Sequence, residues 1–132
     1  MFEYRLSVRG YELDSYNHVN NAVYLNYFEQ ARWDVMRTSG LLEKVLADQI
    51  FLVVTEINIR YSKEACLFDD ILIRTIVELS GPYIIFKQRM TNEATGVKLS
   101  HAVVKTIPLN IDRVPCGVPP EFDILLTHND KF

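Results

Sequence analysis

Two side chains that can do acid–base chemistry, Asp14 and His18, lie close together in a polar stretch that leads into a long predicted helix. A carboxylate can act as a general base or as a nucleophile, and an imidazole changes charge near neutral pH. Asn20 and Asn21 follow at the predicted helix start, where unpaired backbone N–H groups and the positive end of the helix dipole are found. A carboxylate beside such donors suits hydrolysis of an activated acyl group, because the N–H groups can stabilise an oxyanion.

The same residues also have a purely structural interpretation. Asp14 could cap a turn, and His18 could pack with its ring nitrogens hydrogen-bonded. Spacing alone leaves both interpretations open.

The element that must position these residues is a helix predicted over residues 22–39. This stretch contains no Pro or Gly, Asn20 or Asn21 is the expected N-cap, and Gly40 is the expected C′ residue. At about 100° per residue, one face is apolar and the opposite face polar. The apolar face carries Tyr24, Phe28, Ala31 and Val35, and the polar face carries Asn26, Gln30, Asp34 and Arg37. We therefore expect a helix buried in the core.

Alternating or continuous apolar residues predict five strands, at 2–8, 50–61, 71–79, 83–91 and 97–107, with a short helix at 41–48. Residues 50–54 are apolar on both faces, which predicts a central position in the sheet for that strand. The Pro-rich tail predicts a loop with a short helical turn at 121–126. The expected class is α+β, with an antiparallel sheet of about five strands covering the helix.

Length and composition limit the number of domains and the classes of partner that the chain can bind. The 132 residues suit a single domain, 1–132, and the net charge of −3 argues against a broad surface for nucleic acid or an anionic membrane. The N-terminus alternates polar and apolar residues, and no apolar run reaches about 18 residues, so we expect a cytoplasmic protein without a signal peptide or spanning helix. Cys66 and Cys116 are expected to be free thiols.

The motif Asp14 to Tyr24, with His18-Val19-Asn20-Asn21 inside it, and the segment 28–32 (Phe-Glu-Gln-Ala-Arg) resemble the signature of hotdog-fold acyl thioesterases related to 4-hydroxybenzoyl-CoA thioesterase. The similarity is greatest to the bacterial long-chain acyl-CoA thioesterase branch and extends to about Ile107. It implies a hotdog fold, in which the sheet wraps around one long central helix. It also implies hydrolysis of a fatty or aromatic acyl-CoA, or of an acyl carrier protein thioester, without a cofactor. We expect a homodimer or homotetramer, because the long strands leave a sheet edge that a second chain can pair, and no metal, because no Cys, His or carboxylate cluster has metal-ligand spacing.

The resemblance also implies roles for individual residues. Asp14 takes the place of the catalytic carboxylate, and a backbone N–H near Asn20 or Asn21 takes that of the oxyanion donor. His18 would act directly or orient the loop by hydrogen bonds. Asn17 stands where relatives often have Gly, and Asn tolerates left-handed dihedral angles.

Four further residues belong to this interpretation. Tyr24 is expected at the substrate site, where an apolar tunnel could also use Phe28 and Phe51. Glu29 is the second candidate for the catalytic carboxylate, because some hotdog thioesterases use a helix glutamate; its alternative is a surface or interface ion pair with Arg32. Arg60 and Lys63 are expected to bind the nucleotide end of CoA.

Two other functions compete with the thioesterase. Hotdog hydratases that act on enoyl thioesters also carry an Asp and a His, although with a spacing one residue longer and a Pro that is missing here. A non-catalytic acyl-thioester-binding module is the third possibility. Release of free thiol from acyl-CoA, compared with an absorbance change on enoyl-CoA, separates the three.

Overall fold

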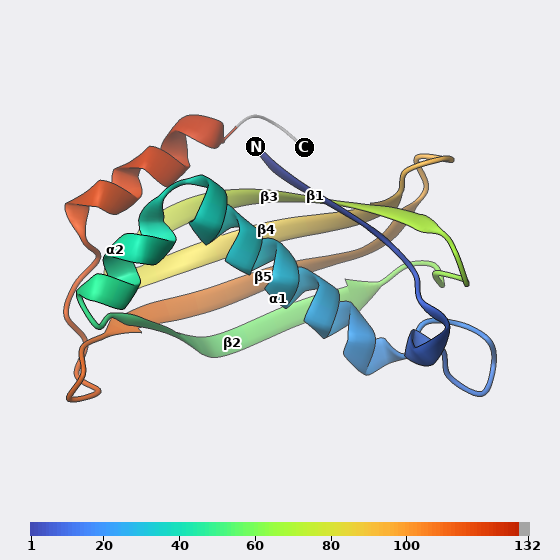
Figure 1. The fold of residues 1–132 in the computed structure, drawn as a ribbon, viewed down its shortest axis with the longest axis horizontal. Helices are drawn as coiled ribbons and strands as arrows, with labels where there is room; N and C mark the ends of the chain where they lie inside the picture. The colour runs from blue at the N-terminus through green and yellow to red at the C-terminus, as the bar shows by residue number, and fades with distance from the viewer. Residues whose placement is uncertain (130–132) are drawn as a thin grey trace.

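The computed structural model describes residues 1–129, in which a five-stranded antiparallel sheet is crossed on one face by a long helix (Figure 1). The strands are β1 (Phe2–Ser7), β2 (Phe51–Tyr61), β3 (Asp70–Ser80), β4 (Tyr83–Asn92) and β5 (Lys98–Leu109), in the spatial order β1-β3-β4-β5-β2. The helices are α1 (Asn21–Thr38) and α2 (Leu41–Ala47), with 3-10 helices η1 (Gly10–Glu12) and η2 (Pro120–His128). The predicted α+β class and antiparallel sheet are confirmed.

Helix α1 begins and ends close to the predicted positions. Asn20 is the N-cap, and its side-chain oxygen accepts a hydrogen bond from the N–H of Ala22 at 3.0 Å. At the other end Gly40 adopts a left-handed conformation with φ of 81°, as a helix-terminating glycine commonly does. The predicted apolar face is buried against the sheet, with Phe28 at its centre fully inaccessible to solvent.

The predicted central position of the second strand is wrong. Within residues 1–129, β2 lies at an edge and pairs only with β5, while β4 occupies the middle of the sheet between β3 and β5. Large apolar side chains on β2 consequently stay accessible to solvent, including Phe51 at 52% and Tyr61 at 45%. A run that is apolar on both faces is typical of a strand in the middle of a sheet. Within residues 1–129, however, no strand pairs with the outer edge of β2.

The helical turn predicted at 121–126 in the Pro-rich tail is found as part of a longer 3-10 helix. Helix η2 runs from Pro120 to His128, and its side chains Phe122 and Leu125 are fully buried. Asn129 follows, and its side chain exchanges two hydrogen bonds with the backbone of Val77 on β3. The tail therefore closes one end of the core.

No helix within residues 1–129 is long and apolar enough to cross a membrane.

Candidate active site

The loop that carries Asp14 and His18 connects η1 to α1 and is held by its own backbone. The N–H of Asp14 donates to the carbonyl of His18 at 2.7 Å, and the N–H of Asn17 donates to the carbonyl of Asp14 at 3.1 Å. Asn17 adopts φ of 62°, a left-handed conformation that Asn tolerates better than most residues. The loop is thus a tight turn that brings its two titratable side chains to the N-terminus of α1.

One oxygen of the Asp14 carboxylate holds this turn together. Oδ1 accepts the N–H of Tyr16 at 2.9 Å and the N–H of His18 at 3.2 Å. Oδ2 accepts no hydrogen bond from any residue of 1–129. Asp14 therefore caps a turn, as the structural interpretation requires, and still presents a second oxygen that could act on a substrate.

His18 contacts the loop through its backbone. Its N–H and its carbonyl bond to Asp14, whereas its imidazole makes no hydrogen bond within the described chain. The loop geometry thus does not depend on a hydrogen bond from the ring.

The two asparagines at the start of α1 differ in whether their backbone N–H groups are already hydrogen-bonded. The N–H of Asn20 donates to the carbonyl of Glu12 at 2.9 Å, so it is already used. The N–H of Asn21, the first helical residue, donates to no group in residues 1–129. Of the two predicted oxyanion donors, only Asn21 is available.

Asp14, His18 and Asn21 line one open cavity of about 260 Å³, together with Val19, Tyr24, Tyr61, Ser62, Lys63 and Glu64. The hydroxyl of Tyr61 donates to the carbonyl of Asn21 at 3.0 Å, and its ring packs edge-on against Tyr24 at 5.1 Å between centroids. Tyr61 could not be predicted at the site from local patterns, because this contact joins the end of an edge strand to the start of the helix.

Tyr24 forms part of the wall of this cavity. Its side chain is only 2% exposed, and its hydroxyl oxygen accepts the N–H of Ala65 at 2.9 Å. Burial raises the pKa of Tyr24, so it stays a neutral phenol. Tyr24 is therefore placed at the predicted site as a structural wall.

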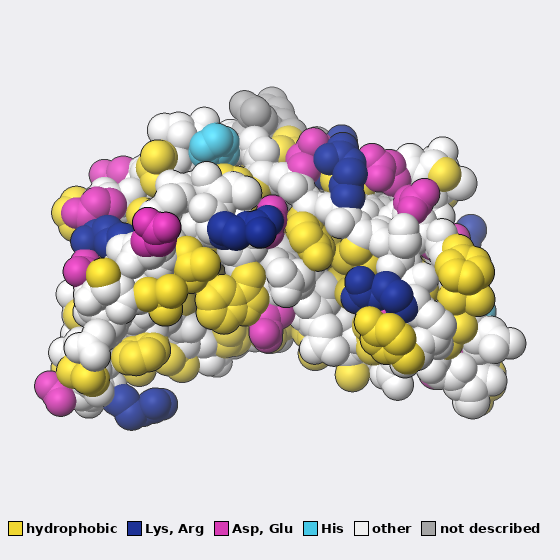
Figure 2. Space-filling view, viewed as in Figure 1, with side chains coloured by type: hydrophobic (Ala, Val, Ile, Leu, Met, Phe, Trp, Pro, Cys, Tyr) yellow, Lys and Arg dark blue, Asp and Glu magenta, His cyan; other side chains and the backbone are white. Residues whose placement is uncertain are grey.

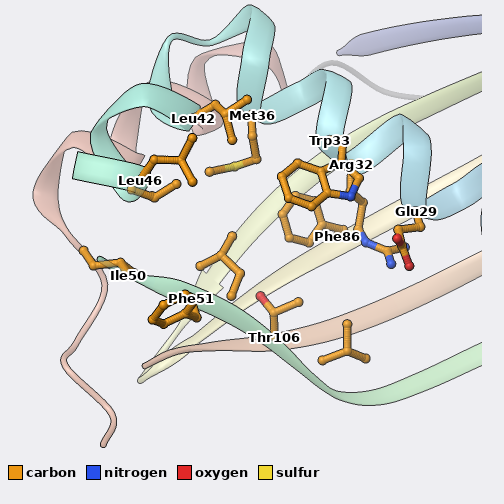
Figure 3. A pocket seen from close by; sticks show the side chains of 13 residues that line it. Glu29, Arg32, Trp33, Met36, Leu42, Leu46, Ile50, Phe51, Phe86 and Thr106 are labelled. Carbon is orange, nitrogen blue, oxygen red and sulfur yellow. The ribbon is translucent and has the colours of Figure 1, made fainter. Parts of the chain in front are cut away.

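A second, larger cavity of about 400 Å³ lies between α1, α2 and β2 (Figure 3). Its lining is mainly apolar and includes Trp33, Met36, Leu42, Leu46, Phe51 and Phe86. On the face seen in Figure 2, hydrophobic side chains gather over this end of the molecule. Of the three predicted tunnel residues, Phe51 lines this cavity, whereas Phe28 is enclosed in the core and Tyr24 lines the other cavity.

Glu29 lies at the second cavity, separated from Asp14. It is exposed and sits about two turns, or roughly 12 Å, further along α1 than Asn21. A single chain thus does not bring the two candidate carboxylates together.

The Glu29–Arg32 ion pair, which the sequence offers as the alternative to a catalytic Glu29, is not made at contact distance, although the two side chains attract each other. Within residues 1–129 the Arg32 guanidinium makes no ion pair within 4.0 Å; it donates from Nη1 to Gln88 Oε1 at 3.1 Å. Gln88 is itself buried and donates to the carbonyl of Phe28. Burial lowers the pKa of Arg32, because desolvation disfavours its charge, and the nearby Glu29 offsets part of this effect.

The two cations expected to bind CoA point to different places. Lys63 lines the cavity of Asp14 and Asn21. Arg60 lies opposite His101 of β5 in the strand register, and alternation along β2 places it on the sheet face opposite to that of Tyr61. Only Lys63 joins the candidate site.

An antiparallel sheet packed on one long helix is the arrangement of the hotdog fold. A model of the thioesterase-like superfamily matches residues 8–125, and the chain belongs to that family.

Individual relatives agree with this assignment. The chain is 37% identical over 108 residues to the long-chain acyl-CoA thioesterase FadM of Escherichia coli K12, covering 81% of this chain and 82% of FadM. It is 30% identical to the acyl-CoA thioesterase YbgC of Haemophilus influenzae, covering 96% of this chain and 95% of YbgC. Among solved structures, the probable thioesterase YbaW of Escherichia coli superposes with a TM-score of 0.86 at 32% identity. The match covers 96% of this chain and 97% of YbaW.

Proposed function

We propose that this protein hydrolyses acyl-CoA thioesters, with Asp14 as general base or nucleophile and the Asn21 N–H as oxyanion donor. The observation that carries the proposal is that Asp14 and Asn21, whose N–H has no partner in residues 1–129, line one cavity at the N-terminus of α1. The relatives named as acyl-CoA thioesterases support CoA as the carrier.

In the general-base route, Asp14 takes a proton from water while the water oxygen attacks the thioester carbonyl carbon. The negative charge that develops on the carbonyl oxygen is stabilised by the Asn21 N–H and by the positive end of the α1 dipole. The C–S bond then breaks, and the thiolate of CoA takes up the proton held by Asp14. In the nucleophilic route the carboxylate attacks the carbonyl carbon directly, the C–S bond breaks and CoA leaves as the thiolate. Water then hydrolyses the resulting anhydride, which releases the free acid, restores the Asp14 carboxylate and provides the proton that the thiolate takes up.

We further propose that the apolar cavity beside Phe51 holds the acyl chain. Its volume of about 400 Å³ lies in the range of ordinary ligand pockets, and Trp33 and Met36 give it an apolar lining. Lys63, which lines the same cavity as Asp14, is the better placed of the two predicted cations to meet a phosphate of CoA.

The protein acts, in this proposal, as a homodimer joined through β2. An edge strand of 11 residues with exposed apolar side chains, among them Phe51, Val54 and Ile57, is an aggregation hazard unless it is paired. Two-fold antiparallel pairing places the start of one β2 opposite the end of the other. The apolar cavity of one subunit then lies next to Asn21 of the partner subunit, so each site uses two chains.

The activity is tested by free-thiol release from a panel of acyl-CoAs that differ in chain length and include aromatic acyl groups. We expect release that depends on Asp14. An absorbance change with enoyl-CoA but no thiol release would instead indicate a hydratase, and no turnover with measurable binding would indicate a binding module.

The shared site is tested by refolding two inactive variants together and measuring the activity of the mixed dimers that form. Asp14→Asn removes the carboxylate, and Leu46→Glu places a charge in the apolar cavity lined by this exposed residue. If the site combines both chains, mixed dimers contain one intact site and activity returns. No recovery would show that each chain works alone, and light scattering that finds a stable, active monomer would remove the dimer proposal.

A further inference from the structure

A buried carboxylate, Glu12, lies just before the active-site loop and has no part in the proposed chemistry. It is 6% exposed and receives three hydrogen bonds. Arg9 donates its backbone N–H to Oε1 at 2.8 Å and its guanidinium to Oε2 at 2.9 Å, and Tyr27 donates its hydroxyl to Oε1 at 2.8 Å. A buried charge is destabilising unless it is paired in this way, so the fold supplies this group with a full set of partners.

Glu12 fastens the loop to α1 at two points. Its side chain accepts from Tyr27, which lies on the buried face of the helix. Its backbone carbonyl accepts the N–H of Asn20, the N-cap, at 2.9 Å. The two candidate reactive groups are immediate neighbours of these contacts, since Asp14 follows Glu12 closely and Asn21 follows Asn20 directly.

The ionisation states suit a strong hydrogen bond. Burial alone would raise the pKa of Glu12, but the hydrogen bonds from Arg9 and Tyr27 outweigh it, and the pKa lies below its ordinary value of 4.5. Burial and the adjacent Glu12 raise the pKa of Tyr27. At neutral pH a charged acceptor therefore meets a neutral phenol donor, which is among the stronger kinds of hydrogen bond in proteins.

We propose that the Tyr27–Glu12 hydrogen bond is a positioning contact that fixes where Asp14 stands relative to the Asn21 N–H. The proposal rests on the proposed function. Neither residue lines the cavity of Asp14, so both act through the loop and the helix start. Because a displacement of about 1 Å in a reacting group can cost about a hundredfold in rate, loss of this contact reduces turnover more than substrate binding.

Tyr27→Phe is the test variant, because it removes only the hydroxyl. We expect kcat to fall by about tenfold or more, with KM within about threefold of wild type. The matched control is Asn129→Ala, which loses the hydrogen bonds to Val77 at the far end of the sheet. Assays are run well below the Tm of both variants, so that a general loss of stability leaves kcat unchanged.

Glu12→Gln is the second variant, and it tests the same contact if Tyr27→Phe folds poorly. Its amide NH₂ cannot accept from Arg9 and its neutral oxygen accepts more weakly, so we expect kcat to fall by about fivefold or more. When both variants fold, the double variant should lose little more than the larger single loss, since both remove one contact.

A folded Tyr27→Phe with kcat within about twofold of wild type overturns the positioning role, as does a loss no larger than that of Asn129→Ala. Failure of the thioesterase proposal itself has a different signature, namely wild-type protein without thiol release, or full activity in Asp14→Asn.

Discussion

Asn20 and Asn21 are adjacent at the start of α1, yet the N–H of Asn20 is bonded to Glu12 and the N–H of Asn21 has no partner within residues 1–129. Because proline has no backbone N–H, a proline substitution can test whether the N–H of Asn21 stabilises the oxyanion. Asn21 is the first helical position, where proline is well tolerated, and Asn20 has φ of −59° and ψ of 137°, which a residue before proline can adopt.

Asn21→Pro should therefore keep the fold and lose the oxyanion donor. We expect kcat to fall by about a hundredfold, whereas Asn21→Ala, which keeps the N–H, should stay within a few-fold of wild type. Circular dichroism and Tm establish that the helix is intact. Equal, small losses in the two variants would argue against an oxyanion hole at Asn21.

Asp14→Asn tests the carboxylate. The amide oxygen can still accept the N–H groups of Tyr16 and His18, so the turn should persist, but the side chain can no longer take a proton from water or attack as an anion. We expect kcat to fall by about a hundredfold or more while acyl-CoA affinity is largely kept. Glu29→Gln is the control and should have nearly normal turnover. An inactive Glu29→Gln beside an Asp14→Asn within about threefold of wild type would place the catalytic carboxylate on the helix.

His18→Ala separates the ring of His18 from its backbone. Since the hydrogen bonds to Asp14 involve only main-chain atoms of His18, the variant should keep the loop and the Tm within about 1 °C to 3 °C of wild type. A kcat loss smaller than that of Asp14→Asn, measured with the same acyl-CoA, is expected if the ring does not touch the substrate. A loss as large as that of Asp14→Asn would give the imidazole a direct part in the reaction.

Asn17 should tolerate glycine better than alanine. At φ of 62° a Cβ is unfavourable, and Asn bears this cost better than most residues. Asn17→Gly is expected to match wild type in stability to within about 0.5 kcal/mol, and Asn17→Ala to lose about 1 kcal/mol. Chemical denaturation measures both, and an Ala variant as stable as the Gly variant would contradict the left-handed turn.

Glu12 should make stability depend on acid pH. Its folded pKa lies below its ordinary value of 4.5, so its contribution is present above that value and is lost as the pH falls through the folded pKa. The difference in Tm between wild type and Glu12→Gln should be largest near neutral pH and shrink below about pH 4.5. A constant difference down to about pH 3 would mean that the folded state does not favour the ionised carboxylate.

Local signals predicted the helix and its ends well. The face formed by Tyr24, Phe28, Ala31 and Val35, the Asn20 cap and the Gly40 terminus all depend on residues close together in sequence. The antiparallel strands were likewise evident from alternation and from turn residues.

Features that depend on distant partners were harder to predict. The apolar run at the start of β2 predicts a central strand, but a local pattern does not identify the neighbouring strands, and β2 lies at an edge of the sheet. Arg32 donates a hydrogen bond to Gln88, which is far away in sequence. Because sequence spacing indicates only near neighbours, it favours Glu29 on the same helix as the partner of Arg32. Glu12 and Tyr27 showed no local signal at all, because a lone Glu in a polar stretch usually indicates a solvated loop.

The pairing of β2 with β5, its one partner strand within residues 1–129, also bears on how the chain folds during synthesis. Strand β2 is complete at Tyr61, but the residues with which it pairs begin only at Ser100. While the ribosome adds the residues between them, an apolar strand waits with both edges open, a condition that favours association with other nascent chains. Expression at lower temperature, which weakens hydrophobic association, should therefore raise the soluble yield.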